Sequence, residues 1–248
     1  MQATRPTLRV QLWSGPRNVS TALMYSFAER PDTRVVDEPL YAHYLRVSDA
    51  DHPLKREVLA AQEQDGEKVV REVLLGSTDR PVLFFKQMAH HLVELDRAFL
   101  RYSANVILTR DPEEMLPSLA ENLAVPTLRD TGYAMQTGLV RELAALGQDP
   151  PVLVARELLL DPRGVLTQLC ARLGIAFDER MLSWKPGPRP EDGVWAPQWY
   201  ASVHRSSGFQ KYERKRAAFP ARLEPLLAEC RPHFAELERR ALRAGVPA

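Results

Sequence analysis

The stretch LRVQLWSGPRNVSTA, residues 8–22, decides the fold of this chain. Its first part, Leu8 to Leu12, is an apolar run that predicts a buried strand, and apolar side chains then recur at helical spacing from Ser20 to Glu29. A tight loop between a strand and a helix directs its free backbone N–H groups at one point, where the helix dipole adds partial positive charge. The stretch therefore predicts a strand, a loop and a helix that together hold an anion such as phosphate or sulfate.

The side chains of this loop support an anion site and exclude two common versions of it. Arg17 supplies a full positive charge, and Ser20 and Thr21 supply hydroxyl donors. The loop lacks the Gly-Lys pair of the ATPase pattern G-x-x-x-x-G-K-[ST], and Gly15 is its only glycine where a dinucleotide loop needs three. Ser, Thr and Asn also serve as ordinary helix N-caps, so an anion role requires a second anion site downstream.

Composition sets the broad class of the protein. A chain of 248 residues with 45% hydrophobic and 26% charged residues suits one large globular α/β domain. Lys and Arg number 33 against 32 Asp and Glu, which gives a net charge of +1. Without an overall basic excess the chain is not expected to bind nucleic acid non-specifically, and any anion site must be local.

Cysteine usage and hydropathy give further expectations. Cys170 and Cys230 lie in apolar periodic stretches without metal-ligand spacing, so both are expected to be buried, reduced thiols, and no metal site is expected. No apolar run reaches transmembrane length, and Arg5 and Arg9 interrupt the N-terminal region where a signal core would lie. The default expectation is a cytoplasmic protein that has no membrane partner.

Short apolar strands alternate with helical segments along the chain. Further strands are predicted at Arg34–Val36, Val82–Phe85, Asn105–Leu108 and Val152–Val154, and helices at His90–Leu100, from Pro112 onward, and at Pro162–Leu173 before Gly174. This alternation predicts a three-layer α/β domain with a mainly parallel central sheet flanked by helices. We expect residues 1–248 to form this single domain. Residues 42–80 are expected to form a cap of helices and loops, and residues 185–200 an ordered loop.

Four charged residues lie at or just beyond the ends of predicted strands. They are Arg17, Glu38, Lys86 and Arg110. In parallel sheets ligands bind outside the carboxyl ends of the strands, so these side chains are expected to border one crevice.

A second anion site is indicated by Arg110-Asp111-Pro112-Glu113-Glu114-Met115-Leu116-Pro117-Ser118. Ser118 falls about two helical turns after Arg110, close to the same helix face. This pattern resembles the one with which sulfotransferases bind the 3′-phosphate of 3′-phosphoadenosine 5′-phosphosulfate (PAPS). The first loop resembles that family's 5′-phosphosulfate loop, and His204–Phe209 lies where the family often closes over the cofactor.

The resemblance implies a P-loop-type sulfotransferase that moves a sulfuryl group from PAPS to a hydroxyl or amine of a small-molecule or glycan acceptor, with no metal required. Residues 42–80 and 185–200 are then expected to shape the acceptor site. It implies that the cofactor is bound by ten residues: Arg17, Asn18, Val19, Ser20, Thr21, Arg110, Ser118, Ser206, Ser207 and Gly208. Arg17 would hold the 5′-phosphate and the sulfuryl oxygens.

The chain departs from the family pattern at several places. Val19 stands where the loop usually has glycine, and Ser206 and Ser207 replace more basic residues. Lys86 matches a strand-end lysine of the vertebrate cytosolic enzymes, but Met88 occupies the position of their catalytic histidine.

Sulfuryl transfer, like phosphoryl transfer, depends mainly on alignment and charge stabilisation. Glu38 is the expected general base, with His90 and His43 as reserves, and Lys86 and Arg17 are expected to stabilise the leaving phosphate. The structural alternatives are a Glu38 that pairs with Arg17 or a helix N-terminus, and a Lys86 that is a solvated strand end. Arg110 has a structural alternative too, a salt bridge with Asp111 or Glu114.

Two other functions stay open. One is a P-loop kinase or nucleotide hydrolase, but the chain lacks the Gly-Lys-[Ser/Thr] element that such enzymes need. Only Val35-Val36-Asp37 imitates their apolar strand that ends in a Mg²⁺-holding aspartate. A non-catalytic nucleotide-binding protein with a sulfotransferase-like fold is compatible with Val19 and Met88. The sequence does not determine the identity of the acceptor or the oligomeric state.

Overall fold

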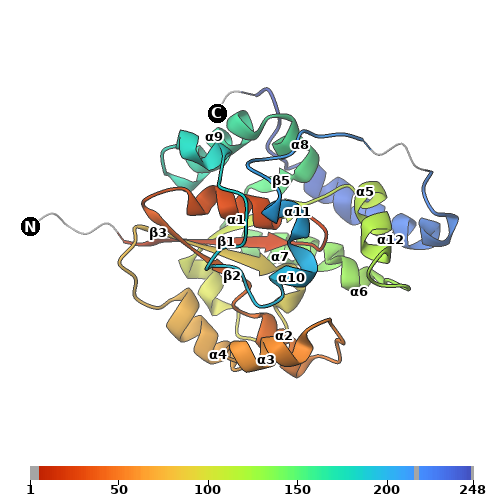
Figure 1. The fold of residues 1–248 in the computed structure, drawn as a ribbon, viewed down its shortest axis with the longest axis horizontal. Coiled ribbons are helices and arrows are strands. Elements are labelled where there is room, and N and C mark those ends of the chain that lie inside the picture. The colour runs from red at the N-terminus through yellow and green to blue at the C-terminus, as the bar shows by residue number, and fades with distance from the viewer. Residues whose placement is uncertain (1–5, 215–217, 247–248) are drawn as a thin grey trace, which may run out of the picture.

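A five-stranded parallel sheet forms the centre of the molecule in the computed structural model, which describes residues 6–214 and 218–246 (Figure 1). The strand order is β2-β3-β1-β4-β5. The strands are β1 (Leu8–Ser14), β2 (Thr33–Asp37), β3 (Val82–Met88), β4 (Ala104–Thr109) and β5 (Val152–Val154). All four pairings are parallel, which confirms the predicted α/β class with its parallel sheet.

The central strand β1 sets the register of the site. Its Leu12 pairs with Lys86 of β3 on one side and with Val106 of β4 on the other. The loops after β1 and β3 therefore leave the same edge of the sheet from neighbouring strands. Because ligands of parallel sheets bind at that edge, this register brings the predicted anion loop next to Lys86.

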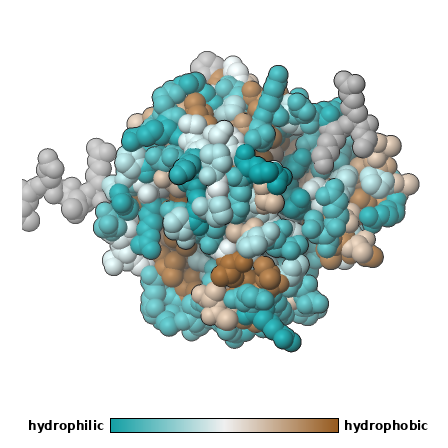
Figure 2. All heavy atoms as spheres, in the orientation of Figure 1, coloured by the Kyte–Doolittle hydropathy of each residue, from teal (hydrophilic) through white to brown (hydrophobic). Residues whose placement is uncertain are grey.

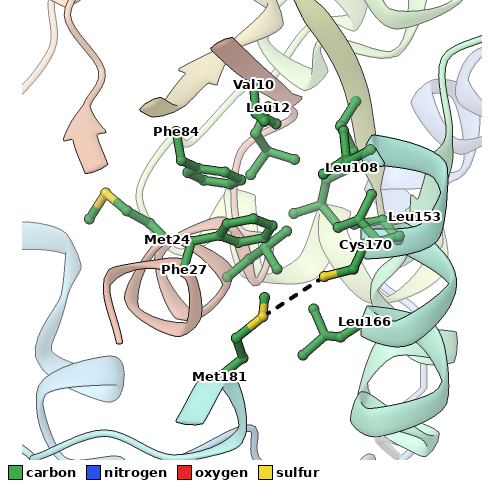
Figure 3. Packing of buried hydrophobic residues seen from close by; sticks show 14 of the residues in the cluster. Val10, Leu12, Met24, Phe27, Phe84, Leu108, Leu153, Leu166, Cys170 and Met181 are labelled. Atoms are coloured by element: carbon green, nitrogen blue, oxygen red, sulfur yellow. Dashed lines mark hydrogen bonds between the residues drawn. The ribbon is translucent and has the colours of Figure 1, made fainter. Parts of the chain in front are cut away.

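One face of the sheet is covered by α1 (Ser20–Ala28), α8 (Ala155–Leu160) and α9 (Pro162–Leu173). Every second residue of β1, such as Val10 and Leu12, points into this layer, as the period of a strand requires. Phe27 of α1 stacks on Phe84 of β3 with ring centroids 4.1 Å apart, and both rings lie at the centre of this core in Figure 3.

The other face packs against α7 (Tyr133–Ala145), against the π-helical turn Val70–Leu74 and against the 3₁₀ turn Ala98–Tyr102. Trp13 of β1 and Phe85 of β3 point to this side, where they meet Leu139 and Leu143. Both faces of the sheet are thus buried, which explains why the strands are nearly continuous apolar runs in the sequence.

The ends of several helices are fixed by local chemistry. In α5 (Pro112–Ala120) proline occupies the first turn and the Asp111 carboxylate accepts the Glu113 N–H. In α9 Asp161 caps the Gly164 N–H, and Gly174 ends the helix with a φ of 70°. Residues 42–80 are helices and loops, as expected. The other α-helices of the described residues are α2 (Tyr41–Val47), α3 (Lys55–Ala61), α4 (Gly66–Val69), α6 (Leu128–Thr131), α10 (Ala196–Trp199), α11 (Ala201–His204) and α12 (Glu224–Glu238).

The helix predicted at His90–Leu100 is wrong. The structure has two short 3₁₀ turns there, Ala89–His91 and Ala98–Tyr102, separated by irregular chain. The Asp96 carboxylate accepts the Ala98 N–H, and the Arg97 guanidinium donates to the carbonyl of Leu92. These local bonds satisfy the backbone without a continuous helix.

Cys170 and Cys230 are buried and free, as the sequence predicted. In the part of the chain that the structure describes, no helix is long and apolar enough to cross a bilayer. In the orientation of Figure 1, the surface of the molecule is mainly hydrophilic, and hydrophobic residues gather in the lower middle of the view (Figure 2).

Candidate functional site

A cavity of about 220 Å³ opens at the carboxyl ends of the strands. It is lined from several elements: the loop after β1, the end of β2, β3, α2 and the segment around α10. Of the predicted site residues, those on its wall are Arg17, Asn18, Ser20, Thr21, Glu38, Lys86 and His90. The convergence expected from strand ends is therefore realised for the first loop, Glu38 and Lys86.

The loop after β1 is held from below by Asn18. Its amide donates to the carbonyl of Leu108 at 3.1 Å, and its side-chain oxygen accepts the Val19 N–H at 2.9 Å. The helix α1 then begins at Ser20 without a side-chain cap. No side chain therefore occupies the N–H groups of its first turn, which is the end of a helix where anions bind.

The two predicted anion sites meet at Arg17. Its backbone has a φ of 51°, its Nε donates to the hydroxyl of Ser118 at 3.0 Å, and its carbonyl accepts from Arg110 at 2.9 Å. Arg110 also lies 3.4 Å from Glu114, as the salt-bridge alternative expected, and the Tyr212 hydroxyl donates to the same carboxylate. Two arginines and a serine from separate strand ends and helices thus form one positive cluster.

Lys86 lies at the base of the cavity in a buried charge cluster and is not a solvated strand end. Its side chain is 2% exposed, and its ammonium group donates to Asp37 at 2.9 Å, to the Tyr200 hydroxyl at 2.7 Å and to Glu38. The Tyr200 hydroxyl donates to Asp37 at 2.7 Å and accepts from Trp195 at 2.9 Å. All three donors of the ammonium group are engaged.

Glu38 follows β2 directly, with its backbone N–H donating to the carbonyl of Lys86 at 2.8 Å and a φ of 42° that turns the chain. Burial raises the pKa of Glu38, the charge of Asp37 adds to this, and Lys86 opposes it. Burial alone would lower the pKa of Lys86, but Asp37 and Glu38 raise it well above its ordinary value. The cluster therefore combines a fixed ammonium ion with a carboxylate of increased basicity.

The two reserve histidines differ in position. His90 lines the cavity, and burial lowers its pKa to about 3, so it is neutral and a poor base at neutral pH. The ring of His43 contacts the carbonyl of Val93 at 2.8 Å and is not among the described side chains that line the cavity.

The predicted C-terminal segment is tied to Trp184. The Ser206 hydroxyl donates to the carbonyl of Val203 at 2.7 Å and accepts from the indole of Trp184 at 3.1 Å, and the Ser207 carbonyl accepts the Trp184 N–H. Gly208 forms an isolated antiparallel β-bridge with Ser183. These residues lie outside the described lining of the cavity, as do Val19, Arg110 and Ser118.

Sequence reasoning missed Asp37 and Tyr200 as site residues. Asp37 directly precedes Glu38, and Tyr200 closes the 185–200 segment expected near the acceptor. Neither has a sequence spacing that points to Lys86, because the contacts span 49 and 114 residues of chain.

Comparisons with known proteins agree with this architecture. The chain matches the family model described as "Sulfotransferase domain" over residues 8–241. Two curated proteins of Arabidopsis thaliana, Branched-chain-amino-acid aminotransferase-like protein 1 and 2, are 42% and 38% identical over 226 residues. The match covers 91% of this chain and 40% of each relative, so the chain spans about two fifths of their length.

Two solved structures have a similar fold. The sulfotransferase domain from the curacin biosynthetic pathway superposes with a TM-score of 0.55 at 14% identity, covering 91% of this chain and 98% of that one. The sulfotransferase from Alicyclobacillus acidocaldarius superposes with a TM-score of 0.53 at 14% identity, covering 96% and 98%.

Proposed function

The chain belongs to the sulfotransferase domain family, and from this premise we propose that it transfers a sulfuryl group from PAPS to a hydroxyl or amine of an acceptor. The observation that carries the proposal is the shared cavity. The residues of an anion-binding loop and a buried Glu38–Lys86 pair line the same space at the carboxyl ends of the strands.

We assign the binding of PAPS, the sulfuryl donor, to the positive cluster around Arg17, Arg110 and Ser118. The first turn of α1 and Arg17 would bind the 5′-phosphosulfate, since free N–H groups and a guanidinium both stabilise anions there. Arg110 and Ser118 would bind the 3′-phosphate, with Ser207 and Gly208 as further candidates. The Ser206 hydroxyl already has two partners, so we assign it to holding the segment through Trp184.

In the proposed reaction the acceptor oxygen or nitrogen forms a bond to sulfur while the bond from sulfur to the phosphate oxygen breaks. The acceptor proton goes to Glu38, and the electron pair leaves with adenosine 3′,5′-bisphosphate. Burial makes Glu38 more basic, which suits a proton acceptor at neutral pH. Arg17 stabilises the charge that develops on the leaving phosphate.

Lys86 has a double role in this scheme. Its ammonium group orients the Glu38 carboxylate, and it assists the leaving group when one of its three donors passes to the bridging oxygen. Asp37 and Tyr200 keep the ammonium group in place during this exchange.

Calorimetric titration with adenosine 3′,5′-bisphosphate in the absence of Mg²⁺ tests the donor assignment. We expect binding of this ligand and weaker binding of ATP. Arg110→Ala should weaken adenosine 3′,5′-bisphosphate much more than 5′-AMP, which lacks the 3′-phosphate. Some loss for both ligands is expected because Arg110 also holds the Arg17 carbonyl, but equal losses would contradict a 3′-phosphate contact.

Two outcomes would favour other functions. Binding of ATP that requires Mg²⁺ would indicate a kinase or nucleotide hydrolase. Tight binding of adenosine 3′,5′-bisphosphate without turnover across alcohols, phenols, amines and sugars would indicate a non-catalytic binding protein, a possibility that the fully engaged donors of Lys86 leave open.

A further inference from the structure

Beyond Glu38 the wall of the cavity is built from rings. They come from α2, from the loop between α2 and α3, from the 3₁₀ turn after β3 and from the segment around α10: Tyr41, Tyr44, His52, His90, His91 and Trp195. The rings of Tyr41 and His91 stack with centroids 4.9 Å apart and an interplanar angle of 9°, and Tyr44 also stacks on His91. The rings of Tyr41 and Trp195 meet edge to face, with centroids 5.1 Å apart and an interplanar angle of 82°.

His91 is a buried polar group among these rings. Its side chain is 1% exposed, and neither of its ring nitrogens has a hydrogen-bond partner among the described residues. His90 Nδ1 is unpartnered as well. A buried polar group without a partner costs about 1–3 kcal/mol, so these nitrogens are poised for a partner that the protein itself does not supply.

The position of His91 connects it to the proposed base. Its Nε2 lies 4.0 Å from the Glu38 carboxylate, too far for a hydrogen bond, and both residues line the cavity. A single ligand atom between them can contact both groups. An oxygen there would accept a hydrogen bond from the imidazole and donate its own proton to Glu38.

The charges around this point restrict what that atom carries. Burial, the imidazoles of His90 and His52 and the Lys86 ammonium group hold the pKa of His91 well below its usual value, so this imidazole is neutral. An ammonium group has no lone pair for the imidazole N–H, and beside Glu38 it meets the Lys86 ammonium group that already contacts this carboxylate. The carboxylates of Glu38 and Asp37 disfavour added negative charge. A neutral hydroxyl satisfies both conditions and supplies a donor and an acceptor at one atom.

We propose that His91 positions the acceptor hydroxyl against Glu38, and that the ring-lined part of the cavity selects a neutral alcohol carried on an apolar or aromatic ring. This proposal rests on the proposed sulfotransferase function and narrows its acceptor to alcohols, excluding amines and carboxylic acids. His91 acts as a positioning residue, because its N–H holds a lone pair of the oxygen while Glu38 takes the proton.

Three probes of matched shape test the selectivity: cyclohexanol, cyclohexylammonium and cyclohexanecarboxylate. Each is titrated into ¹⁵N-labelled protein, with and without adenosine 3′,5′-bisphosphate, while the imidazole nitrogen signals are followed by NMR. Cyclohexanol should shift the His91 signals and saturate. The two charged probes should bind about tenfold more weakly or not at all, because one unfavourable buried contact is worth that much.

His91→Phe keeps the ring stack and removes both nitrogens, and it should weaken cyclohexanol about tenfold while binding of adenosine 3′,5′-bisphosphate stays unchanged. His43→Phe is the matched control, since His43 is a second buried histidine outside the cavity wall. If either variant fails to fold, the wild-type spectra still decide the matter. His91 signals that do not respond to cyclohexanol, or a charged probe that binds more tightly, would overturn the proposal.

The experiments distinguish a failure of the PAPS-dependent function from a failure of the alcohol acceptor class. Loss of the alcohol response in a protein that binds adenosine 3′,5′-bisphosphate contradicts only the acceptor class. A protein that binds cyclohexanol at His91 but not adenosine 3′,5′-bisphosphate contradicts the PAPS-dependent function and leaves the alcohol site supported.

Discussion

The two sides of the site hold their charges in different ways. On the side proposed to bind PAPS, Arg17 is half-buried, and its Nε contacts the neutral hydroxyl of Ser118. On the other side Lys86 is 2% exposed and contacts two carboxylates. A guanidinium group with a neutral partner keeps its attraction for an incoming anion, whereas a buried ammonium ion is balanced before any ligand arrives.

Positive charge near the strand ends therefore has two different roles in this protein. Positive charge around Arg17 is expected to act mainly on ligand affinity. Positive charge at Lys86 is expected to act mainly on stability and on the basicity of Glu38. Four predictions test this division, from the largest expected effect to the smallest.

Glu38→Gln should lower turnover by about 10²–10⁴-fold, because it keeps the shape of the side chain and removes the proton acceptor. The affinity for adenosine 3′,5′-bisphosphate, measured by calorimetry, should stay near that of the wild type. Glu57→Gln, an exposed substitution on α3, is the control and should change neither quantity. If Glu38→Gln retains most of the activity and His90→Ala loses it, the base is His90.

Lys86→Met should lower the free energy of unfolding by about 3–5 kcal/mol, because it leaves the Asp37 and Glu38 carboxylates buried without a counter-charge. Urea denaturation measures this loss. The double variant Lys86→Met/Glu38→Gln should recover part of it, since one uncompensated charge is then removed. A single-variant loss of less than about 1 kcal/mol would place Lys86 with the exposed ion pairs.

Asp37→Asn should move the acid side of the pH–activity profile to lower pH. Glu38 acts as a base only when ionised, so turnover rises with pH through its pKa, and burial together with the charge of Asp37 raises that pKa. Removing the neighbouring charge lowers the pKa of Glu38 and lets it ionise at lower pH. Asp51→Asn, on the exposed rim of the cavity, should leave the profile in place, and a shift of the Asp37→Asn profile to higher pH would refute the assignment.

Arg17→Gly should change stability by about 1 kcal/mol or less while it sharply weakens adenosine 3′,5′-bisphosphate. Glycine relieves the left-handed backbone of Arg17, worth roughly 1–2 kcal/mol, and this offsets the lost hydrogen bond to Ser118. Urea denaturation and calorimetry on the same variant separate the two effects. A large loss of stability with intact affinity would reverse the division between the two sides of the site.

Local sequence patterns were sufficient to predict much of the fold, including the loop between β1 and α1. The helix Pro162–Leu173 was predicted with its bounds because proline, apolar spacing and a following glycine specify both ends within one segment. The helix expected at His90–Leu100 was wrong because its apolar spacing competes with side-chain bonds such as that of Asp96 to the Ala98 N–H. Propensity alone does not reveal which of the two wins.

The buried cluster around Lys86 could be predicted from the sequence only in part. Glu38 and Lys86 were identified because each ends a strand, and parallel strands end at a common edge. Tyr200 and His91 carried no such mark, since their importance comes from contacts with residues far away in the chain.

By itself the sequence determined the parallel α/β class, the strand, loop and helix start at β1 and α1, and the strand-end position of Glu38 and Lys86. Each of these follows from periodicity, capping and strand direction, which act over a few neighbouring residues. Only the tertiary structure decided that Lys86 is buried between Asp37, Glu38 and Tyr200, that Arg110 supports Arg17, and that rings surround His91. These contacts join segments separated by many residues, and packing and charge compensation select them only when the chain has folded.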